Sequence, residues 1–445
     1  MNLLKRTSTS LSVMVVVAFA IRIFAFWALQ THARVPVITN LPYGYETGRI
    51  AKSIAEGHGF SSPLAVDTGP TIWLTPVYPY VLAGVFKIWG VYSYRSLMAI
   101  VSLDDIFSAL TCIPIFYIGK RVAGTVVGAC AAWYWVIFPN SVLISFEWIW
   151  DTALAALAAA LILWATLAIA DSRRVKDWIG YGLLWGAGLM VNAAIFAVAP
   201  FLFLWLALRV RGKSMGQMWL RLPAVALIFM GIVCVPWTVR NYVVFHRVIV
   251  FRSNFGLELW LGNNDKVPDT WSGDLHPNDY EPERAKYAKL GEIEYMRQKQ
   301  SEAIQFMEAH PRDTLRFFWR RFADNWMGTW EPLQDGWSKM SLVNRSFLVS
   351  NISLSLLGML GVLFMYREKN QYAFPLATFP LIYPIVYYVT HSSLRYRHPI
   401  DPVMVVLAIF ALAYPVRVLV QRRNHARLGV ENAGPKPNPQ AAPLF

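Results

Sequence analysis

Charged residues are scarce in this sequence of 445 residues: they make up 15% of it, against about 25% in an ordinary soluble domain. Hydrophobic residues reach 56%, which is more apolar surface than a single water-soluble core hides. Composition therefore excludes a soluble enzyme of this size, a disordered chain, a collagen and a disulfide scaffold. It predicts an all-α polytopic membrane protein.

Cysteine is also rare, and the familiar nucleotide and hydrolase motifs are missing. Cys112, Cys130 and Cys234 all fall inside apolar segments, so we predict buried, inert thiols with no redox or metal role. The sequence has no HExxH pattern, no Walker loop, no Rossmann fingerprint and no GxSxG. Energy for any reaction must then come from an activated substrate that is already in the membrane.

Ten apolar runs are long enough to be considered as membrane spans, for which a helix needs about 20 residues. The ten runs are 11–30, 96–119, 122–142, 147–170, 178–193, 194–209, 222–240, 346–366, 372–390 and 402–420. The pair within 178–209 is separated only by Val191-Asn192. A cleaved signal peptide is the alternative for the first run, but that run carries Arg22 and lacks a small-x-small cleavage site.

The net charge of +14 lies mainly in short loops between apolar runs, where it indicates membrane topology and not a nucleic-acid-binding surface. With a cytoplasmic N-terminus, ten alternating spans leave five short basic loops on the cytoplasmic side, as the positive-inside rule requires. These are 119–121, 171–177, 209–221, 366–371 and the tail from Arg417. An eleventh span at 74–92 would reverse the later loops, so we predict there a helix that lies in the outer interface or dips into it.

The same topology divides the chain into four parts. Residues 1–240 form an N-terminal membrane module, whose first outer loop and interfacial helices cover 31–95. Residues 241–345 form a mainly helical extracytoplasmic insertion, with a helix at 281–310 that ends before Pro311. Residues 346–420 return to the membrane, and 421–445 form a disordered cytoplasmic tail.

The first outer loop contains an acid directly after the first span. Glu46 starts an amphipathic helix within 43–60, flanked by Tyr45 and Arg49, which we expect to contact substrate. A carboxylate that is partly desolvated at a membrane interface is more basic and suits a general base. The alternative is an acid favoured at a helix N-terminus by the helix dipole.

A second pair of acids opens the fourth span on the same side. Glu147 and Asp151 are four residues apart, so we expect them on one helical face. We expect Asp151 to take part in catalysis and Glu147 to contact substrate; helix capping and interface anchoring are the alternative roles. Asp104 and Asp105 lie deeper, in the second span, where we expect polar contacts between helices.

The last outer loop, 391–402, is rich in arginine, against the positive-inside bias. It contains Arg395, Arg397 and His398, and guanidinium groups match phosphate geometry. We therefore predict a phosphate-binding site here, with Arg240, at the outer end of another span, as a weaker candidate. Salt bridges to acidic loops are the alternative reading.

Taken in order, these features resemble the integral-membrane C-type (GT-C) glycosyltransferases. The shared features are an acid after the first span, a PxYP-like interfacial helix, an acid opening a later span, a soluble outer insertion and a late RYxxP-type loop. The closest groups are the protein O-mannosyltransferase and lipid A aminoarabinose transferase branch with its uncharacterised bacterial members. The resemblance covers roughly residues 10–415, and it rests on order and topology.

The resemblance carries over to individual residues only in part. The family's first loop reads Asp-Glu-x-x-Tyr-Ala; Glu46 stands at the Asp and Thr47 at the Glu, so the carboxylate pair that would bind a metal is incomplete. Asp151 matches the acid that opens a later span. Arg395, Tyr396 and Arg397 match the late loop, and Tyr396 becomes a further expected substrate contact.

The resemblance implies a membrane glycosyltransferase that moves a sugar from a polyprenyl-phosphate-linked donor to a lipid, glycan or protein acceptor. Catalysis is expected at the extracytoplasmic face, in the inner membrane of a bacterium, with no cofactor required by the sequence and no support for a divalent metal. Two alternatives stay open: a transporter of an anionic solute, and a polyprenyl-linked glycan ligase or polymerase.

Overall fold

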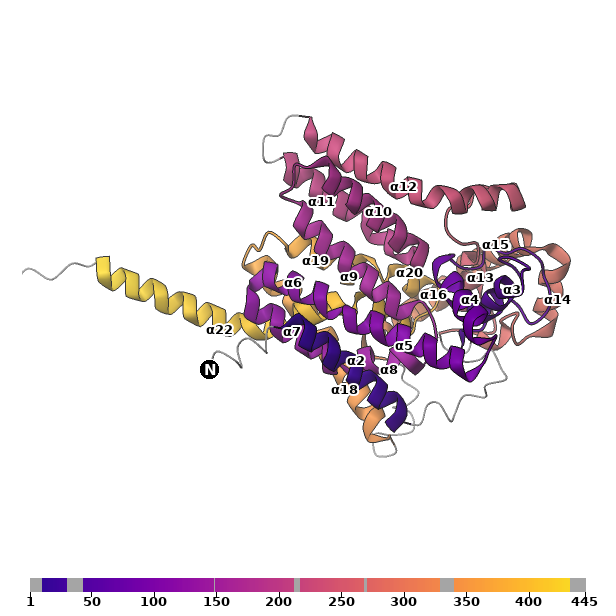
Figure 1. Ribbon diagram of the computed structural model, residues 1–445, viewed down its shortest axis with the longest axis horizontal. Coiled ribbons are helices and arrows are strands. Elements are labelled where there is room, and N and C mark those ends of the chain that lie inside the picture. Colours follow the sequence, from indigo (N-terminus) through magenta and orange to yellow (C-terminus); the bar gives the residue numbers. More distant parts are fainter. Residues whose placement is uncertain are drawn as a thin grey trace, which may run out of the picture.

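The computed structural model describes residues 10–29, 43–147, 149–211, 217–267, 270–328 and 340–432. Helices dominate these ranges, and the only β pairing within them is an isolated antiparallel bridge between Ser61 and Pro70. The chain is an all-α polytopic membrane protein. Figure 1 shows a bundle of long helices, with a cluster of shorter helices gathered at one end of it.

The bundle is built from long apolar helices, several of which are kinked or broken. They are α2 (Leu11–Ala28), α5 (Tyr94–Leu110), α6 (Cys112–Ala123), α7 (Thr125–Ile137), α8 (Pro139–Glu147), α9 (Thr152–Ile169), α10 (Val175–Val191), α11 (Ala199–Arg211), α12 (Met218–Phe245), α18 (Leu342–Arg367), α19 (Ala373–Ile382), α20 (Ile385–Val389) and α22 (Asp401–Asn432). Alanine and leucine make up most of α9, which explains both its helicity and its close packing.

Each of the ten predicted apolar runs falls on helix. Among the described residues, seven helices are long and apolar enough to cross a bilayer, or eight if the bent pair α7–α8 is one span. The two remaining predicted spans correspond to α10 and to α19 with α20. The predicted break at Val191-Asn192 is confirmed, because α10 ends at Val191 and a 3-10 helix, η3 (Ala193–Val198), precedes α11.

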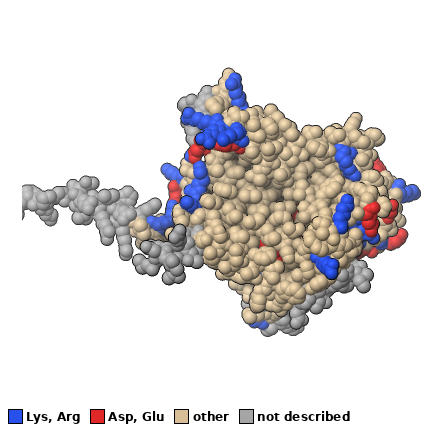
Figure 2. Space-filling model, in the orientation of Figure 1, with Lys and Arg blue, Asp and Glu red and all other residues tan. Residues whose placement is uncertain are grey.

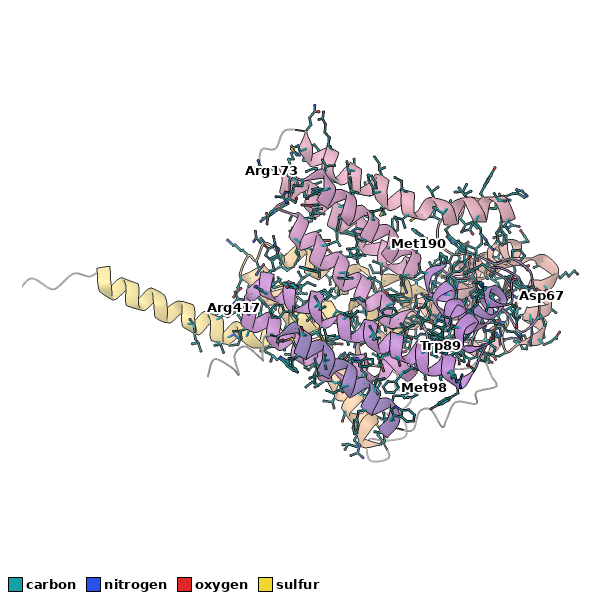
Figure 3. All side chains as sticks on the ribbon, in the orientation of Figure 1. Asp67, Trp89, Met98, Arg173, Met190 and Arg417 are labelled. Atoms are coloured by element: carbon teal, nitrogen blue, oxygen red, sulfur yellow. The ribbon has the colours of Figure 1, made fainter. Side chains whose placement is uncertain are left out.

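The predicted cytoplasmic loops lie together at one end of the bundle. Arg121 pairs with Asp171 at 2.6 Å, Arg209 donates to Gln371, and Arg417 pairs with Glu368 at 3.2 Å. In Figure 2 charged side chains gather at the two ends of the visible face, separated by a broad uncharged band. Figure 3 places Arg173 and Arg417 at one end and Asp67 at the other.

The first span is tied into the bundle by a buried arginine. The Arg22 guanidinium donates to the hydroxyls of Ser108 and Ser141 and to the Ala18 carbonyl, at 2.8–3.0 Å. These partners lie on α2, α5 and α8, so α2 is a packed member of the bundle. The expected interhelical contacts of the second span are also present: Asp104 accepts from Tyr78 and Asp105 accepts from Ser145, both at 2.6 Å.

The opposite end carries shorter helices. They are α3 (Glu46–Ala55), α4 (Val77–Trp89), α13 (Phe255–Gly262), α14 (Glu281–Leu290), α15 (Glu292–Ala309), α16 (Pro311–Met327) and α21 (Leu394–Arg397). At 13 residues, α4 is too short to span, as predicted for 74–92. The single helix predicted at 281–310 is wrong: Gly291, with φ 75°, separates α14 from α15. The predicted end before Pro311 is confirmed.

Two smaller predictions also need correction. Cys112 and Cys234 are buried, but Cys130 is exposed on α7, because its side of that apolar helix faces away from the bundle. The tail predicted as disordered from residue 421 is helical at first, since α22 continues to Asn432. Residues 433–445 lie outside the described residues, as do 31–42 of the first outer loop.

Candidate functional site

A cavity of about 530 Å³ lies where the bundle meets the outer helices. Its wall combines segments that are far apart in sequence: 45–47, 73–79, 150–152, 191–197, 252–258, 271–279 and 386–399. Of the sequence-predicted residues, Tyr45, Glu46, Asp151, Arg395 and Tyr396 line it. The fold therefore brings two predicted acids, Glu46 and Asp151, and one predicted arginine into a single cavity.

Glu46 is placed by a tight turn before α3. Gly44 and Tyr45 both have positive φ, at 69° and 46°. A Cβ on Gly44 would collide with the Trp150 indole and the Ile149 carbonyl, so only glycine allows this turn to pack there. The turn thereby sets the start of α3 directly against the segment that carries Asp151.

The Glu46 carboxyl is only 15% exposed and is held by residues of the insertion. Its Oε1 accepts from the Asn278 amide and lies 3.6 Å from His276 Nε2. Burial raises the pKa of Glu46 to about 6, partly opposed by Arg49, Asn278 and Arg395. Burial also lowers the pKa of His276. At neutral pH, Glu46 is thus ionised yet more basic than an exposed carboxylate.

Asp151 is the residue before α9, and its Oδ2 accepts from Asn192 Nδ2 at 2.9 Å. Burial raises its pKa, while Asn192, Arg252 and Arg395 oppose the rise. The expectation that Glu147 and Asp151 share one helical face is wrong: Glu147 ends α8, and α9 begins only at Thr152. The Glu147 side chain lies outside the described part of the chain.

Arg395 projects into the cavity between aromatic rings. Its guanidinium carbon lies 3.2 Å from the centroid of Trp150 and 4.7 Å from that of Tyr396. It also donates to the Tyr396 hydroxyl at 2.7 Å. A second arginine, Arg252, lines the same cavity and is exposed. Two arginines therefore line a space that the partly buried side chains of Glu46 and Asp151 also line.

Four of the predicted residues do not line the cavity: Arg397, His398, Arg240 and Arg49. Arg397 is fully buried, pairs with Asp401 at 2.8 Å and donates to Ser355 at 3.0 Å. His398 lies 3.1 Å from Asp401 and stacks on Trp135.

Arg240 likewise serves the backbone of the first outer loop. It donates to the carbonyls of Thr71 at 2.7 Å and Phe60 at 2.8 Å. Arg49 does not line the cavity but contacts a residue that does. It donates to the side-chain oxygen of Asn278, whose amide nitrogen donates to Glu46.

Several cavity residues had no role assigned to them from the sequence. Arg252 and Glu258 belong to RSNFGLELWLGNN, and His276 and Asn278 belong to LHPND; His391 starts the late loop. Polar residues in a soluble insertion carry no desolvation cost that would mark them. The signal that could have found them is the pairing of each with a charge on another segment, which requires the fold. Among the described residues, no group of three His, Cys, Asp or Glu side chains could hold a metal ion.

Comparisons with known proteins agree with this architecture. Residues 73–238 match the family model described as dolichyl-phosphate-mannose-protein mannosyltransferase, which is less than half of the chain. No curated protein matches the sequence. The chain is similar in fold to the oligosaccharyltransferase AglB from Archaeoglobus fulgidus in complex with an inhibitory peptide and a dolichol-phosphate. That likeness has a TM-score of 0.54 at 16% identity, over 96% of this chain and 52% of that one.

A second structure of the Archaeoglobus fulgidus oligosaccharyltransferase, in complex with Zn and sulfate, gives the same TM-score and identity over 95% and 51% of the two chains. ArnT from Cupriavidus metallidurans bound to undecaprenyl phosphate gives a TM-score of 0.47 at 14% identity, over 93% and 66%. The chain spans about half the length of the oligosaccharyltransferases it resembles. The oligosaccharyltransferase structures thus confirm the predicted resemblance to C-type glycosyltransferases for the fold, and the family model confirms it for the segment 73–238.

Proposed function

We propose that this protein is a membrane glycosyltransferase that moves a sugar from a polyprenyl-phosphate-linked donor to a lipid, glycan or protein acceptor. The observation that carries the proposal is the shared cavity: a partly buried carboxylate of raised pKa, Glu46, and a guanidinium, Arg395, line the same space at the end opposite the basic loops. We place this end outside the cytoplasmic membrane of a bacterium, with both termini inside.

The two cavity arginines are suited to the donor phosphate. In the transfer, the acceptor nucleophile attacks the anomeric carbon, the bond from that carbon to the phosphate oxygen breaks, and polyprenyl phosphate leaves with the bonding electrons. Arg395, with Arg252, would stabilise the negative charge that develops on the leaving phosphate, an electrostatic effect often worth several kcal/mol. Arg252 replaces Arg397 and Arg240 in this role, because neither of those lines the cavity.

Glu46 would accept the proton that the acceptor hydroxyl or amine loses. Its raised pKa matches a base that operates near neutral pH. Asp151, held by Asn192, would orient the sugar or the acceptor within the same cavity. The insertion contributes 271–279 to the cavity next to Glu46, so it is the part placed to select the acceptor.

The apolar part of the cavity suits a lipid. Ala193, Ala194, Ala197 and Phe196 line it on the side of η3, and Val386 lines it from α20. Phe196 is 44% exposed, so this wall continues to the outside of the bundle. A polyprenyl tail could lie along it with its phosphate at the arginines. The similar archaeal oligosaccharyltransferase was solved with a dolichol-phosphate, which supports this class of ligand.

Lipid mass spectrometry of a strain that lacks the gene tests the proposal. We expect a polyprenyl-phosphate sugar to accumulate and one glycan to lose a terminal unit, and we expect the wild-type gene to reverse both. The size of the lost unit distinguishes a single-sugar transferase from a glycan ligase or polymerase. An unchanged lipid profile, together with uptake of a labelled anionic solute by proteoliposomes, would establish the transporter instead.

A further inference from the structure

A chain of four polar side chains runs from the insertion to the cavity arginine. On α13, Glu258 Oε2 lies 3.4 Å from His391 Nδ1. His391 Nε2 lies 2.7 Å from the Tyr396 hydroxyl, and Arg395 Nη2 lies 2.7 Å from the same hydroxyl. All four residues line the cavity, and sequence reasoning assigned no role to two of them, Glu258 and His391.

The available protons give this chain one direction. Arg395 can only donate, so the Tyr396 oxygen accepts from it. The nearby Glu258 carboxylate favours the His391 tautomer with its proton on Nδ1, which leaves Nε2 to accept the single Tyr396 proton. That nitrogen is then the acceptor, and the His391 proton sits on Nδ1, which makes no hydrogen bond but lies 3.4 Å from Glu258 Oε2. Two hydrogen bonds therefore run from Arg395 through Tyr396 to His391, and the Glu258 carboxylate acts on the ring by its charge.

The surroundings of His391 favour its neutral form. Burial and the positive charges of Arg395 and Arg321 hold the pKa of His391 well below its usual range. Trp271 stacks on the ring at 5.1 Å, which fixes its plane. The Asn254 amide donates to the other oxygen of Glu258 at 2.7 Å and so orients that carboxylate.

Backbone hydrogen bonds also join the insertion to the segment that precedes Arg395. Asn263, at the end of α13, donates to the Val389 carbonyl at 2.8 Å. Arg321 of α16 donates to that carbonyl at 2.8 Å and also to the Gly262 carbonyl. Gly262 lies so close to the Thr390 carbonyl that a Cβ would collide with it. The insertion and the loop before Arg395 therefore form one packed unit.

We propose that Glu258 and His391 are positioning residues that act through Tyr396 to fix the guanidinium of Arg395 for the donor phosphate. The inference rests on the proposed function and adds a role for the insertion in shaping the donor site. Arg395 has several rotatable bonds, and an anchored guanidinium loses less conformational freedom when the phosphate binds.

The test measures the affinity of the purified full chain for farnesyl phosphate, a short polyprenyl phosphate, by titration calorimetry. We expect Tyr396→Phe and Glu258→Gln each to weaken binding about 3- to 10-fold, the range of coupling between residues of one network. In an Arg395→Ala background the same substitutions should change affinity less than about twofold, since their effect passes through Arg395. In turnover assays, the donor KM should rise while kcat at saturating donor stays nearly constant.

A matched control separates positioning from general stability. Tyr388→Phe removes a buried hydroxyl from α20, just before the late loop; this hydroxyl accepts from Trp326 at 2.8 Å and takes no part in the Glu258–His391–Tyr396–Arg395 chain. It should leave affinity unchanged even where it lowers the unfolding temperature. Wild-type affinity in Tyr396→Phe and Glu258→Gln, or equal losses with and without Arg395, would overturn the inference. Failure of the wild-type protein itself to bind farnesyl phosphate would instead refute the proposed donor class.

Discussion

The guanidinium of Arg395 lies over the indole of Trp150, 3.2 Å from the ring centroid. The contact joins the late loop to the turn before α9 and puts a positive charge next to Asp151. Arg395 also lowers the pKa of both Glu46 and Asp151 against the effect of burial. The carboxylate and guanidinium groups that the sequence marks in three distant loops therefore act on one another within one cavity.

Arg395 and Arg397 should behave differently when replaced. Arg395→Ala removes a side chain that faces the cavity, so the protein should fold normally and lose donor binding. Arg397→Met leaves Asp401 buried without its main partner, which should cost about 3–5 kcal/mol of folding stability. Size-exclusion profiles of the two variants in detergent check this. A well-folded Arg397→Met protein with only a raised donor KM would return Arg397 to the phosphate site.

Activity should depend on the ionisation of Glu46. Burial raises its pKa to about 6, and a general base works only in its deprotonated form. We expect kcat/KM to be constant above pH 7 and to fall below pH 6, with a slope that approaches tenfold per pH unit. The measurement is a pH profile of transfer in proteoliposomes. A rate that stays constant down to pH 5 would exclude Glu46 as the base.

The ionisation of Glu46 should also make the free energy of unfolding depend on pH. The folded-state pKa of Glu46 lies above its ordinary value of 4.5, so burial disfavours the charged form, and the penalty grows as pH rises from about 4.5 to 6. Glu46→Gln should therefore stabilise the protein by up to about 2 kcal/mol at pH 8 and by nothing at pH 4. Unfolding temperatures at the two pH values check the sign, and a variant less stable than wild type at pH 8 would contradict it.

The orientation in the membrane is open to cysteine labelling. Asp67 and Arg173 are both exposed and lie at opposite ends of the molecule (Figure 3). In a background without the native cysteines, Asp67→Cys should react with an impermeant maleimide on intact cells, and Arg173→Cys only after permeabilisation. The reverse pattern would place the cavity on the cytoplasmic side and remove the proposed topology.

The sequence predicted the bundle well because membrane spans and short basic loops are marked by composition. It predicted Glu46, Asp151 and Arg395 because a charge at a membrane interface is expensive and therefore conspicuous. It could not separate Arg395 from Arg397 by residue type. On a helix of 3.6 residues per turn, residues two apart point roughly 200° away from each other, so only one of them reaches the cavity. The insertion residues gave no such signal, because polar side chains are ordinary in a soluble segment.

The most direct test of the central claim compares two glutamate-to-glutamine substitutions at the two ends of α3. Glu46→Gln and Glu56→Gln change the same residue type near opposite ends of α3, but Glu56 is exposed at the helix end and pairs only loosely with Lys52, at 3.8 Å. Proteoliposomes that contain a polyprenyl-phosphate sugar and the acceptor are assayed for release of free polyprenyl phosphate. We predict release by wild type and Glu56→Gln, and a loss of about 100-fold or more in Glu46→Gln, the scale of general-base catalysis. Equal release by all three proteins would contradict the account.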